Sequence, residues 1–283
     1  MSETAFKTQY RDETIAQFER MQSVLRSTVV TEAVVNGNEA TFLVSGSGGS
    51  EAVTRGVNGL IPARGDNNEQ YTAVLKEWHD LVRKTQFNIF ASQGDQRALM
   101  QRTTLGTINR RIDKDIIDLL ATGTRNTGAA AQLGETLALR AKTALQNADV
   151  PWDNNIFALI TPAAEAYLMQ LDSFASADYV SDRPMESAPL AWDDRVKFKR
   201  WIGINWLVHP GLPGKGTASA KCFMYHKNAI GHAANSGGMM TGVGYDEEQD
   251  YSYSRASMYL GGTVLQNSGI IVINHDDSAF AIA

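Results

Sequence analysis

The sequence lacks several features that define narrow classes of protein. It contains one cysteine, Cys222, which excludes an internal disulfide. No apolar run approaches the roughly 20 residues of a membrane helix, and the N-terminus has neither the basic start nor the apolar segment of a signal peptide. We therefore expect a cytosolic protein with no membrane partner. Its 43% hydrophobic and 20% charged content suits an ordinary folded core.

Clusters of basic residues are also absent. The formal net charge is −5, and lysine and arginine are interspersed with acidic residues throughout. High-affinity nucleic-acid binding needs clustered basic side chains that displace counterions from phosphates. The composition therefore argues against tight nucleic-acid binding, although it is compatible with a protein that encloses nucleic acid without gripping it.

Recognisable catalytic motifs are missing as well. The stretch Pro213–Thr217 has the wrong spacing for a phosphate loop, and His226 and His232 are six residues apart, which suits no zinc pair. The acidic run Asp246–Asp250 lacks the alternating ligands of a calcium loop. A nucleophile pair of Cys222 with a histidine stays open, because only distances can exclude it. We expect no catalytic residue, no cofactor and no metal.

One long amphipathic helix, the spine helix, organises the chain. It is predicted from about Gln93 to Thr122, which at 1.5 Å per residue spans roughly 40 Å. Asp95 can accept hydrogen bonds from the first free amides, and Gly123 permits the stop. The apolar stripe is Leu105, Ile108, Ile112, Ile116 and Leu119. Arg110 and Asp113 lie on the opposite face, which we expect to be solvated or to form salt bridges to another subunit.

The first 26 residues have an amphipathic pattern. Phe6, Tyr10 and Phe18 recur at roughly helical spacing with charges between them. They fit either a helix docked on its own body or an arm whose apolar face lies on a neighbouring subunit. Further along, two β-branched runs flank Asn36-Gly37-Asn38, a pattern that predicts a β-hairpin.

A stretch rich in glycine, serine and asparagine then interrupts the chain from Ser45 to about Asn68. A loop this long inside a compact domain is uncommon, and is usually functional or disordered. The segment that follows is apolar, and carries Tyr71, Val74, Trp78, Leu81 and Phe87. We therefore predict a two-stranded excursion over about 46–90 that leaves the body and is held by something outside the monomer.

The remainder of the chain mixes helix and strand patterns, which indicates an α+β fold. Thr161 followed by Pro162 is a helix start, and the uninterrupted apolar run Asn155–Ile160 predicts a buried central strand. The other predicted elements are a helix between Leu133 and Ala148, strands at Arg200–Val208 and Ala220–Tyr225, loops at Ser173–Asp194 and Asn235–Gly244, and a closing hairpin of Ser257–Leu265 and Ile270–Asn274.

Four segments of this C-terminal half are familiar in their order. They are ALITPAAEAYLMQL, GINWLVHPGLP, AKCFMYHKNAIG and the closing SMYLGGTVLQNSGIIVI. Together with the preceding arm, glycine-rich loop and spine helix, they resemble the major capsid proteins of tailed double-stranded DNA bacteriophages, which have the Hong Kong 97-type fold. The resemblance covers nearly the whole chain in element order. It implies a structural subunit, not an enzyme, that self-assembles into hexamers and pentamers of an icosahedral shell.

The resemblance also implies a division of the chain. Residues 1–45 would be the N-terminal arm, 46–90 the extended loop, 91–125 with 254–283 the peripheral domain, and 126–253 the axial domain. The Gly237–Tyr245 loop and the acidic run after it would meet at the centre of each hexamer or pentamer. Candidate contacts between subunits are Phe6, Tyr10, Phe18, Arg64, Asp66, Tyr71, Trp78, Arg110, Asp113, Asp246 and Glu247.

Several partners follow from the same resemblance. The chain begins at Met1 without a long helical prefix, so we expect a separate scaffolding protein, together with a portal and a candidate decoration protein. Phage DNA would be enclosed without sequence-specific binding, in a virion capsid whose subunits are synthesised in the bacterial host cytoplasm. The alternatives are a cytosolic hydrolase-like enzyme with the glycine-rich segment as its lid, a nanocompartment shell, and a minor virion structural protein.

Overall fold

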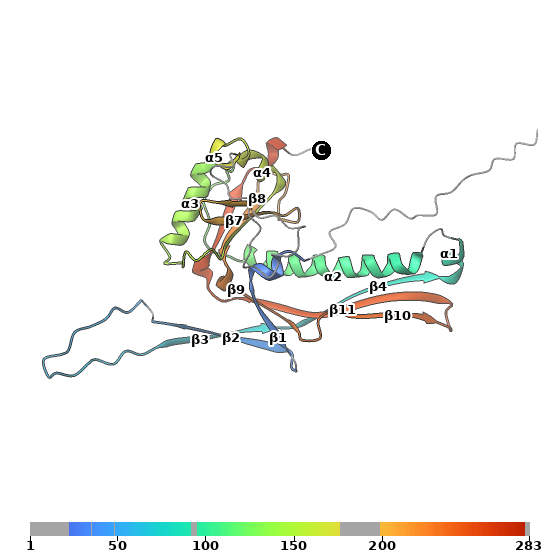
Figure 1. The fold of residues 1–283 in the computed structure, drawn as a ribbon, viewed down its shortest axis with the longest axis horizontal. Coiled ribbons are helices and arrows are strands. Elements are labelled where there is room, and N and C mark those ends of the chain that lie inside the picture. Colours follow the sequence, from blue (N-terminus) through green and yellow to red (C-terminus); the bar gives the residue numbers. More distant parts are fainter. Residues whose placement is uncertain (1–22, 35, 48, 92–94, 176–198, 281–283) are drawn as a thin grey trace, which may run out of the picture.

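The computed structural model describes residues 23–34, 36–47, 49–91, 95–175 and 199–280. These residues form a compact body of helices and strands, and an elongated sheet that runs away from it (Figure 1). A two-stranded ribbon projects beyond one end of the elongated sheet, and a short helix lies at the other end (Figure 1). The molecule is therefore extended, with its two ends far from the compact body.

A five-stranded sheet forms the centre of the compact body. It contains β5 (Ile156–Ile160), β6 (Lys199–Trp201), β7 (Ile204–Val208), β8 (Ala220–His226) and β12 (Ile270–His275), in the order β12-β8-β5-β7-β6. Every residue of β5 is buried, as its apolar run predicts. The body also holds α3 (Glu135–Gln146), α4 (Pro162–Leu168) and α5 (Asp172–Ala175). Helix α4 begins where expected, because the hydroxyl of Thr161 accepts a hydrogen bond from the amide of Ala164.

The second five-stranded sheet is long and narrow. It contains β1 (Val30–Val34), β4 (Lys76–Thr85), β9 (Ile230–Asn235), β10 (Met240–Asp246) and β11 (Tyr251–Val264), in the order β1-β9-β11-β10 with β4 also paired to β11. Helix α2 (Gln96–Ala121) lies along this sheet, and is preceded by α1 (Gln86–Ala91) (Figure 1). The 3-10 helix η1 (Leu25–Thr28) packs against α2. The sheet and α2 therefore form one long unit.

Helix α2 is the predicted spine helix. Asp95 accepts hydrogen bonds from the amides of Arg97 and Ala98 at 3.0 and 3.1 Å, which confirms the predicted cap. The buried stripe contains Met100, Ile108, Ile112, Ile116, Ile117 and Leu120. Leu105, expected in this stripe, is 37% exposed, whereas Asp113, expected in solvent, is fully buried. The buried face is therefore neither purely apolar nor placed as the periodicity predicts.

The glycine-rich excursion is present, but its strands differ from the prediction. Strands β2 (Glu39–Gly46) and β3 (Asn67–Val74) pair antiparallel as a separate two-stranded sheet, and the residues 47–66 join them. We use the name extended loop for this unit, residues 39–74. Strand β4, predicted to be part of the excursion, belongs instead to the elongated sheet.

The predicted hairpin across Asn36-Gly37-Asn38 is wrong. Strand β1 pairs in parallel with β9, and β2 pairs with β3. Gly37 does turn the chain with a φ of 111°, but a turn alone does not determine which strands pair. Burial chooses it here, because the inward side chains Ala40 and Phe42 of β2 pack with Ala73 of β3.

Three C-terminal predictions are also corrected. The run Arg200–Val208 is two strands, β6 and β7, because Ile202 and Gly203 both have positive φ and form a tight hairpin turn. The segment Asn235–Gly244, predicted as a loop, ends β9 and contributes most of β10, where Gly244 packs beneath the ring of Tyr253. The closing strands do not form a hairpin, since β11 and β12 lie in different sheets.

The sheets divide the chain differently from the expected ranges. Residues 230–264 lie beside α2 in the elongated sheet, whereas β12 returns to the compact body. The largest core cluster joins the two parts, because it contains residues of α2, η1 and strands from both sheets. The crossings run through η2 (Lys227–Ala229) and η3 (Asn267–Gly269), while η4 (Ser278–Phe280) follows β12.

Candidate functional site

The tip of the extended loop is an exposed apolar surface. All described residues from 47 to 66 are exposed, and the hydrogen bonds recorded between their backbone atoms are short-range, such as that from the amide of Gly56 to the carbonyl of Leu60. The apolar side chains presented here are Val53, Val57, Leu60 and Ile61, all at least 64% exposed. Leu43 on β2 is also exposed. Sequence reasoning overlooked them, although the run GLIPA is a recognisable aliphatic signal.

The base of the extended loop is held firmly. Phe42 is 8% exposed and its ring covers Gly231, where a Cβ atom would lie 2.9 Å from the ring carbons. The carbonyl of Val74 crosses Gly261 so closely that a Cβ there would lie 2.2 Å from its oxygen. The loop therefore has a fixed root and an unsupported tip, which suits a segment that reaches another molecule.

Two predicted contact residues lie in the exposed part of this loop, and a third lies on β3. Arg64 and Asp66 form an ion pair of 2.9 Å, with 49% and 63% of their side chains exposed. Tyr71 on β3 is half-buried and donates a hydrogen bond to Glu69, an interaction that raises the pKa of the Tyr71 phenol. These side chains remain accessible to a neighbouring molecule.

Trp78 has a different role from the predicted one. It lies on β4, packs against the main core, and stacks with Arg111 of α2 at 3.7 Å from the ring centre. The stack is worth roughly 1 kcal/mol and fixes β4 against α2. Trp78 is thus engaged within its own chain, because β4 belongs to the elongated sheet and not to the excursion.

A second exposed apolar surface lies at the far end of the elongated sheet. Phe87 and Phe90 on α1 are 74% and 88% exposed, and Leu81 on β4 is 44% exposed. We call Phe87 and Phe90 the α1 patch. The sequence pattern placed Leu81 and Phe87 on a return strand and missed Phe90. Helix α1 stands at the opposite end of the molecule from the extended loop (Figure 1).

Asp113 is the clearest correction among the predicted contacts. Its carboxylate accepts hydrogen bonds from the hydroxyl of Ser23 at 2.7 Å and from the amides of Val24 and Leu25 at 3.1 Å. The Nε2 atom of His209, from the compact body, lies 3.5 Å away. Asp113 is therefore an internal anchor and is not exposed to a neighbouring subunit, because η1 covers it.

The remaining predicted contact residues belong to the N-terminal arm and to α2. Phe6, Tyr10 and Phe18 lie outside the described residues. Arg110 is half-buried and donates a hydrogen bond to the hydroxyl of Thr107 on the same helix. A contact of these four residues with another subunit stays a prediction.

The acidic run occupies a turn at the end of the elongated sheet. Asp246 caps this turn by accepting hydrogen bonds from the amides of Glu248 and Gln249, and these bonds lower the pKa of its carboxyl group. Glu247 is exposed beside it. The turn joins β10 to β11 close to α1, away from the compact body (Figure 1). Asp246 and Glu247 thus lie at the end of the elongated sheet and not in the compact body.

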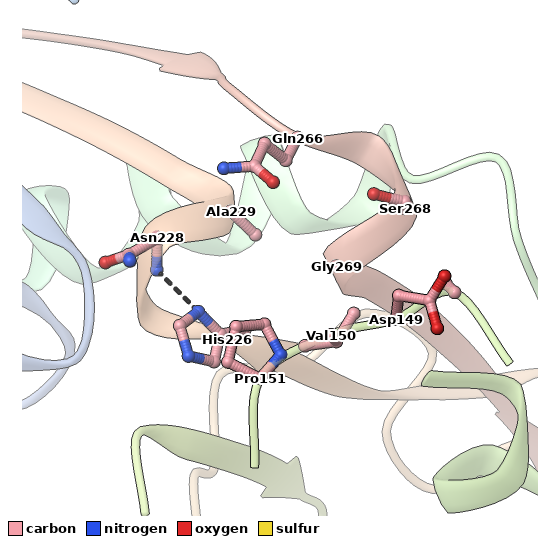
Figure 2. A pocket seen from close by; sticks show the side chains of 10 residues that line it. Asp149, Val150, Pro151, His226, Asn228, Ala229, Gln266, Ser268 and Gly269 are labelled. Atoms are coloured by element: carbon pink, nitrogen blue, oxygen red, sulfur yellow. Dashed lines mark hydrogen bonds between the residues drawn. The ribbon is translucent and has the colours of Figure 1, made fainter. Parts of the chain in front are cut away.

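A small pocket lies where the segment 148–151 meets η2 and η3 (Figure 2). The His226 ring accepts a hydrogen bond at Nδ1 from the amide of Asn228, and its Nε2 lies 2.9 Å from the carboxylate of Asp153. Both ring nitrogens are engaged in structural contacts, which leaves this histidine no free nitrogen for proton transfer.

The remaining chemical candidates are buried. Cys222 on β8 is fully enclosed, and burial raises the pKa of its thiol to about 12, so it stays protonated and unreactive. Within the described parts of the chain, no three His, Cys, Asp or Glu side chains are placed to hold a metal ion. None of the helices described there is long and apolar enough to span a membrane.

Comparison with known proteins agrees with this arrangement. A family model described as phage capsid protein matches residues 3–277. No curated protein matches the chain. The structure of Mycobacterium phage Che8 is similar with a TM-score of 0.72 and 14% identity, over 97% of this chain and 98% of that one.

Two cyanophage capsids are also similar. The Pam1 capsid asymmetric unit has a TM-score of 0.72 and 11% identity, over 98% of each chain. The P-SCSP1u capsid has a TM-score of 0.71 and 12% identity, over 96% of this chain and 93% of that one. The matches extend over almost the full length, so they cover both the compact body and the elongated sheet. The chain therefore belongs to the phage capsid protein family, with a Hong Kong 97-type fold, and is a self-assembling structural component of an icosahedral virion shell and not an enzyme.

Proposed function

We propose that copies of this chain associate head to tail into hexamers and pentamers, with the extended loop of one copy lying on the elongated sheet of the next. The observation that carries the proposal is the exposed apolar tip of the loop beyond its fixed root. Burying an aliphatic side chain contributes about 1.5–3 kcal/mol. Four such side chains at the tip would provide a large part of the free energy of association.

The two apolar surfaces support an interface between different faces. The tip of the extended loop and the α1 patch lie at opposite ends of the molecule (Figure 1). An interface of two unlike surfaces repeats from copy to copy and closes into a ring when the rotation allows. Arg64, Asp66 and Tyr71 would lie at the polar rim of such an interface, where charges contribute orientation more than affinity.

The domain roles are proposed in a revised form. The elongated sheet with α2 fits the peripheral domain, and the compact body of β5–β8, β12 and α3–α5 fits the axial domain. The sheet memberships support this division. Asp246 and Glu247 then become candidate contacts between peripheral domains, while Phe6, Tyr10, Phe18 and Arg110 remain candidate contacts of the arm and of α2.

Further partners rest on resemblance to the capsid family. We propose a separate scaffolding protein, a portal and a decoration protein as partners, and packaged DNA that is enclosed without sequence-specific binding. The net charge of −5 and the lack of basic clusters support a shell that does not grip DNA. Self-association of this chain can be tested without any of these partners.

The proposal is tested by shortening the extended loop. Residues 47–66 are replaced by Asn-Gly, which joins the paired residues Gly46 and Asn67 through a short hairpin turn. The expected product is a folded, soluble subunit that forms no shells, because β2, β3 and the root are retained while the apolar tip is lost. Electron microscopy and sedimentation measure assembly, and circular dichroism measures folding.

A point variant with a matched control separates loop chemistry from loop length. Leu60→Asp with Ile61→Asp places charges in the tip and is expected to reduce shell yield at least tenfold. Asn58→Asp adds a charge at an exposed polar position of the same loop and should assemble normally. Normal shells from both the shortened loop and the double variant would refute the proposed contact.

A further inference from the structure

A polar cluster is enclosed where α2 meets the elongated sheet. It consists of Arg26, Trp78, Arg111, Asp115 and His232. The carboxylate of Asp115 lies 3.6 Å from Nη2 of Arg111 and 3.6 Å from Nε2 of His232. Both separations exceed ordinary hydrogen-bond distances. The cluster thus brings together charged and polar groups without pairing them closely.

The cluster concentrates unsatisfied polar atoms. Among the residues that the structure describes, seven buried side-chain nitrogen or oxygen atoms have no hydrogen-bond partner. Five of them are Trp78 Nε1, Arg111 Nε, Asp115 Oδ2, His232 Nδ1 and His232 Nε2. Such atoms are rare in native proteins, and each costs about 1–3 kcal/mol. Their concentration marks the cluster as a weak point of the packing.

The cluster lies where η1 and β4 meet α2 and β9. Arg26 lies on η1, next to the N-terminal segment, and Trp78 lies on β4, directly after the extended loop. His232 lies on β9, paired with Thr31 of β1. The roots of both appendages therefore share this cluster with α2.

We propose that the cluster is an acid-sensitive joint, in which protonation of His232 separates α2 from β9 and loosens the roots of the N-terminal segment and the extended loop while the compact body stays folded. This inference does not depend on which surfaces meet in the shell.

The charged groups around His232 come from η1 and α2. Arg26 comes from η1, and Asp115 and Arg111 come from α2. Its strand neighbours, Thr31 on β1 and Gly262 on β11, do not titrate. Lys76 and Asp118 act on the Asp115 carboxyl group in opposite directions. A proton on His232 therefore adds a buried cation near Arg26, with the carboxylate of Asp115 at 3.6 Å as its acidic neighbour.

The direction of the pH effect follows from these surroundings. Burial, and then Arg26, lowers the pKa of His232 from 6.5 to about 4. An opened joint takes up the proton at about 6.5, so the stability of the closed joint is complete above that pH and declines as the pH falls toward 4. Burial raises the pKa of Asp115 above 3.8, so the closed joint holds this proton more readily than the open one, which opposes the effect of His232.

The test is amide hydrogen exchange on the full-length protein at pH 8 and pH 5, corrected for the intrinsic exchange rates. The opening equilibrium of η1, β1, β4 and β9 is expected to rise roughly 30-fold at pH 5, as the two pKa values of His232 require. Strands β5 and β8 of the compact body should change much less. The variant His232→Gln, which cannot be protonated, should lose this pH response.

Two further variants and one direct titration control the test. His226→Gln removes a histidine outside the joint and should keep the response, whereas Arg26→Gln should reduce it by removing a nearby positive charge. If His232→Gln does not fold, the titration of His232 in the wild-type protein by NMR decides, with a midpoint near 4 expected. A midpoint near 6.5, or an unchanged response in a folded His232→Gln variant, would overturn the proposal.

Discussion

At the scale of single residues, Asp113 shows how one buried carboxylate can join three parts of a chain. It lies on α2, accepts hydrogen bonds from the backbone amides at the start of η1, and faces His209 of the compact body. A helix N-terminus carries unpaired amides and a partial positive charge, so a carboxylate is a favourable partner there. The start of η1 is thereby fixed against α2.

Replacing Asp113 by Asn should destabilise the subunit by about 2 kcal/mol. The amide nitrogen of asparagine is a donor, and it would face the donors Ser23, Val24 and Leu25. Urea unfolding of the unassembled protein measures the loss. Asp118→Asn, on the exposed face of the same helix, is the control and should change stability by less than about 0.5 kcal/mol. Equal losses in the two variants would contradict the anchoring role.

At the scale of elements, the extended loop is fixed to the sheet by close backbone contacts. Gly261 of β11 allows the carbonyl of Val74 to cross directly over the strand, and Gly231 of β9 does the same for the ring of Phe42. A side chain at either position would displace the loop, because the neighbouring atoms are already in contact. The direction of the loop is therefore set by two glycines on other strands.

The change Gly261→Ala should weaken this attachment. Its Cβ would lie 2.2 Å from the oxygen and 2.7 Å from the carbon of Val74, both of which are backbone atoms that cannot rotate away. We expect a loss of about 1–3 kcal/mol and faster amide exchange in β3. Gly65→Ala, whose Cβ would meet nothing within 4 Å, should leave thermal unfolding unchanged. A shift in unfolding temperature of the same size in the control would exclude the steric explanation.

At the scale of the whole molecule, the subunit is extended and presents unlike apolar surfaces at its two ends. This shape exposes the α1 patch and the loop tip that a compact monomer would bury. Interfaces of permanently assembled subunits resemble a core divided in half. Much of the stability of this protein is therefore expected to belong to the assembled shell.

The variant Phe87→Ser with Phe90→Ser tests the second end of the molecule. Both rings are largely exposed in the subunit, so its unfolding free energy should change by less than about 0.5 kcal/mol. Burial of each ring in the shell would contribute roughly 1.5–3 kcal/mol, so the concentration needed for assembly should rise at least tenfold. Gln86→Ser on the same helix is the matched control. Unchanged assembly in the double variant would remove the α1 patch from the interface.

The elements with local causes can be predicted from the order of the residues alone. The spine helix, its cap at Asp95, the buried strand β5 and the helix start at Thr161 all follow from spacing and from neighbouring residues. The glycine-rich excursion followed from composition, and the order of elements was sufficient to indicate the capsid fold. Each of these depends on contacts within a few residues or on an average over a segment.

The contacts between distant segments, in contrast, are seen only in the folded chain. The partner of β1, the place of β10, the separation of β11 from β12 and the burial of Asp113 depend on segments far apart in the chain. The same is true of the cluster around His232, since no spacing in the sequence relates it to Asp115 or Trp78. A strand or charged residue carries its own preference for burial, but its partner is chosen by the free energy of packing the whole chain.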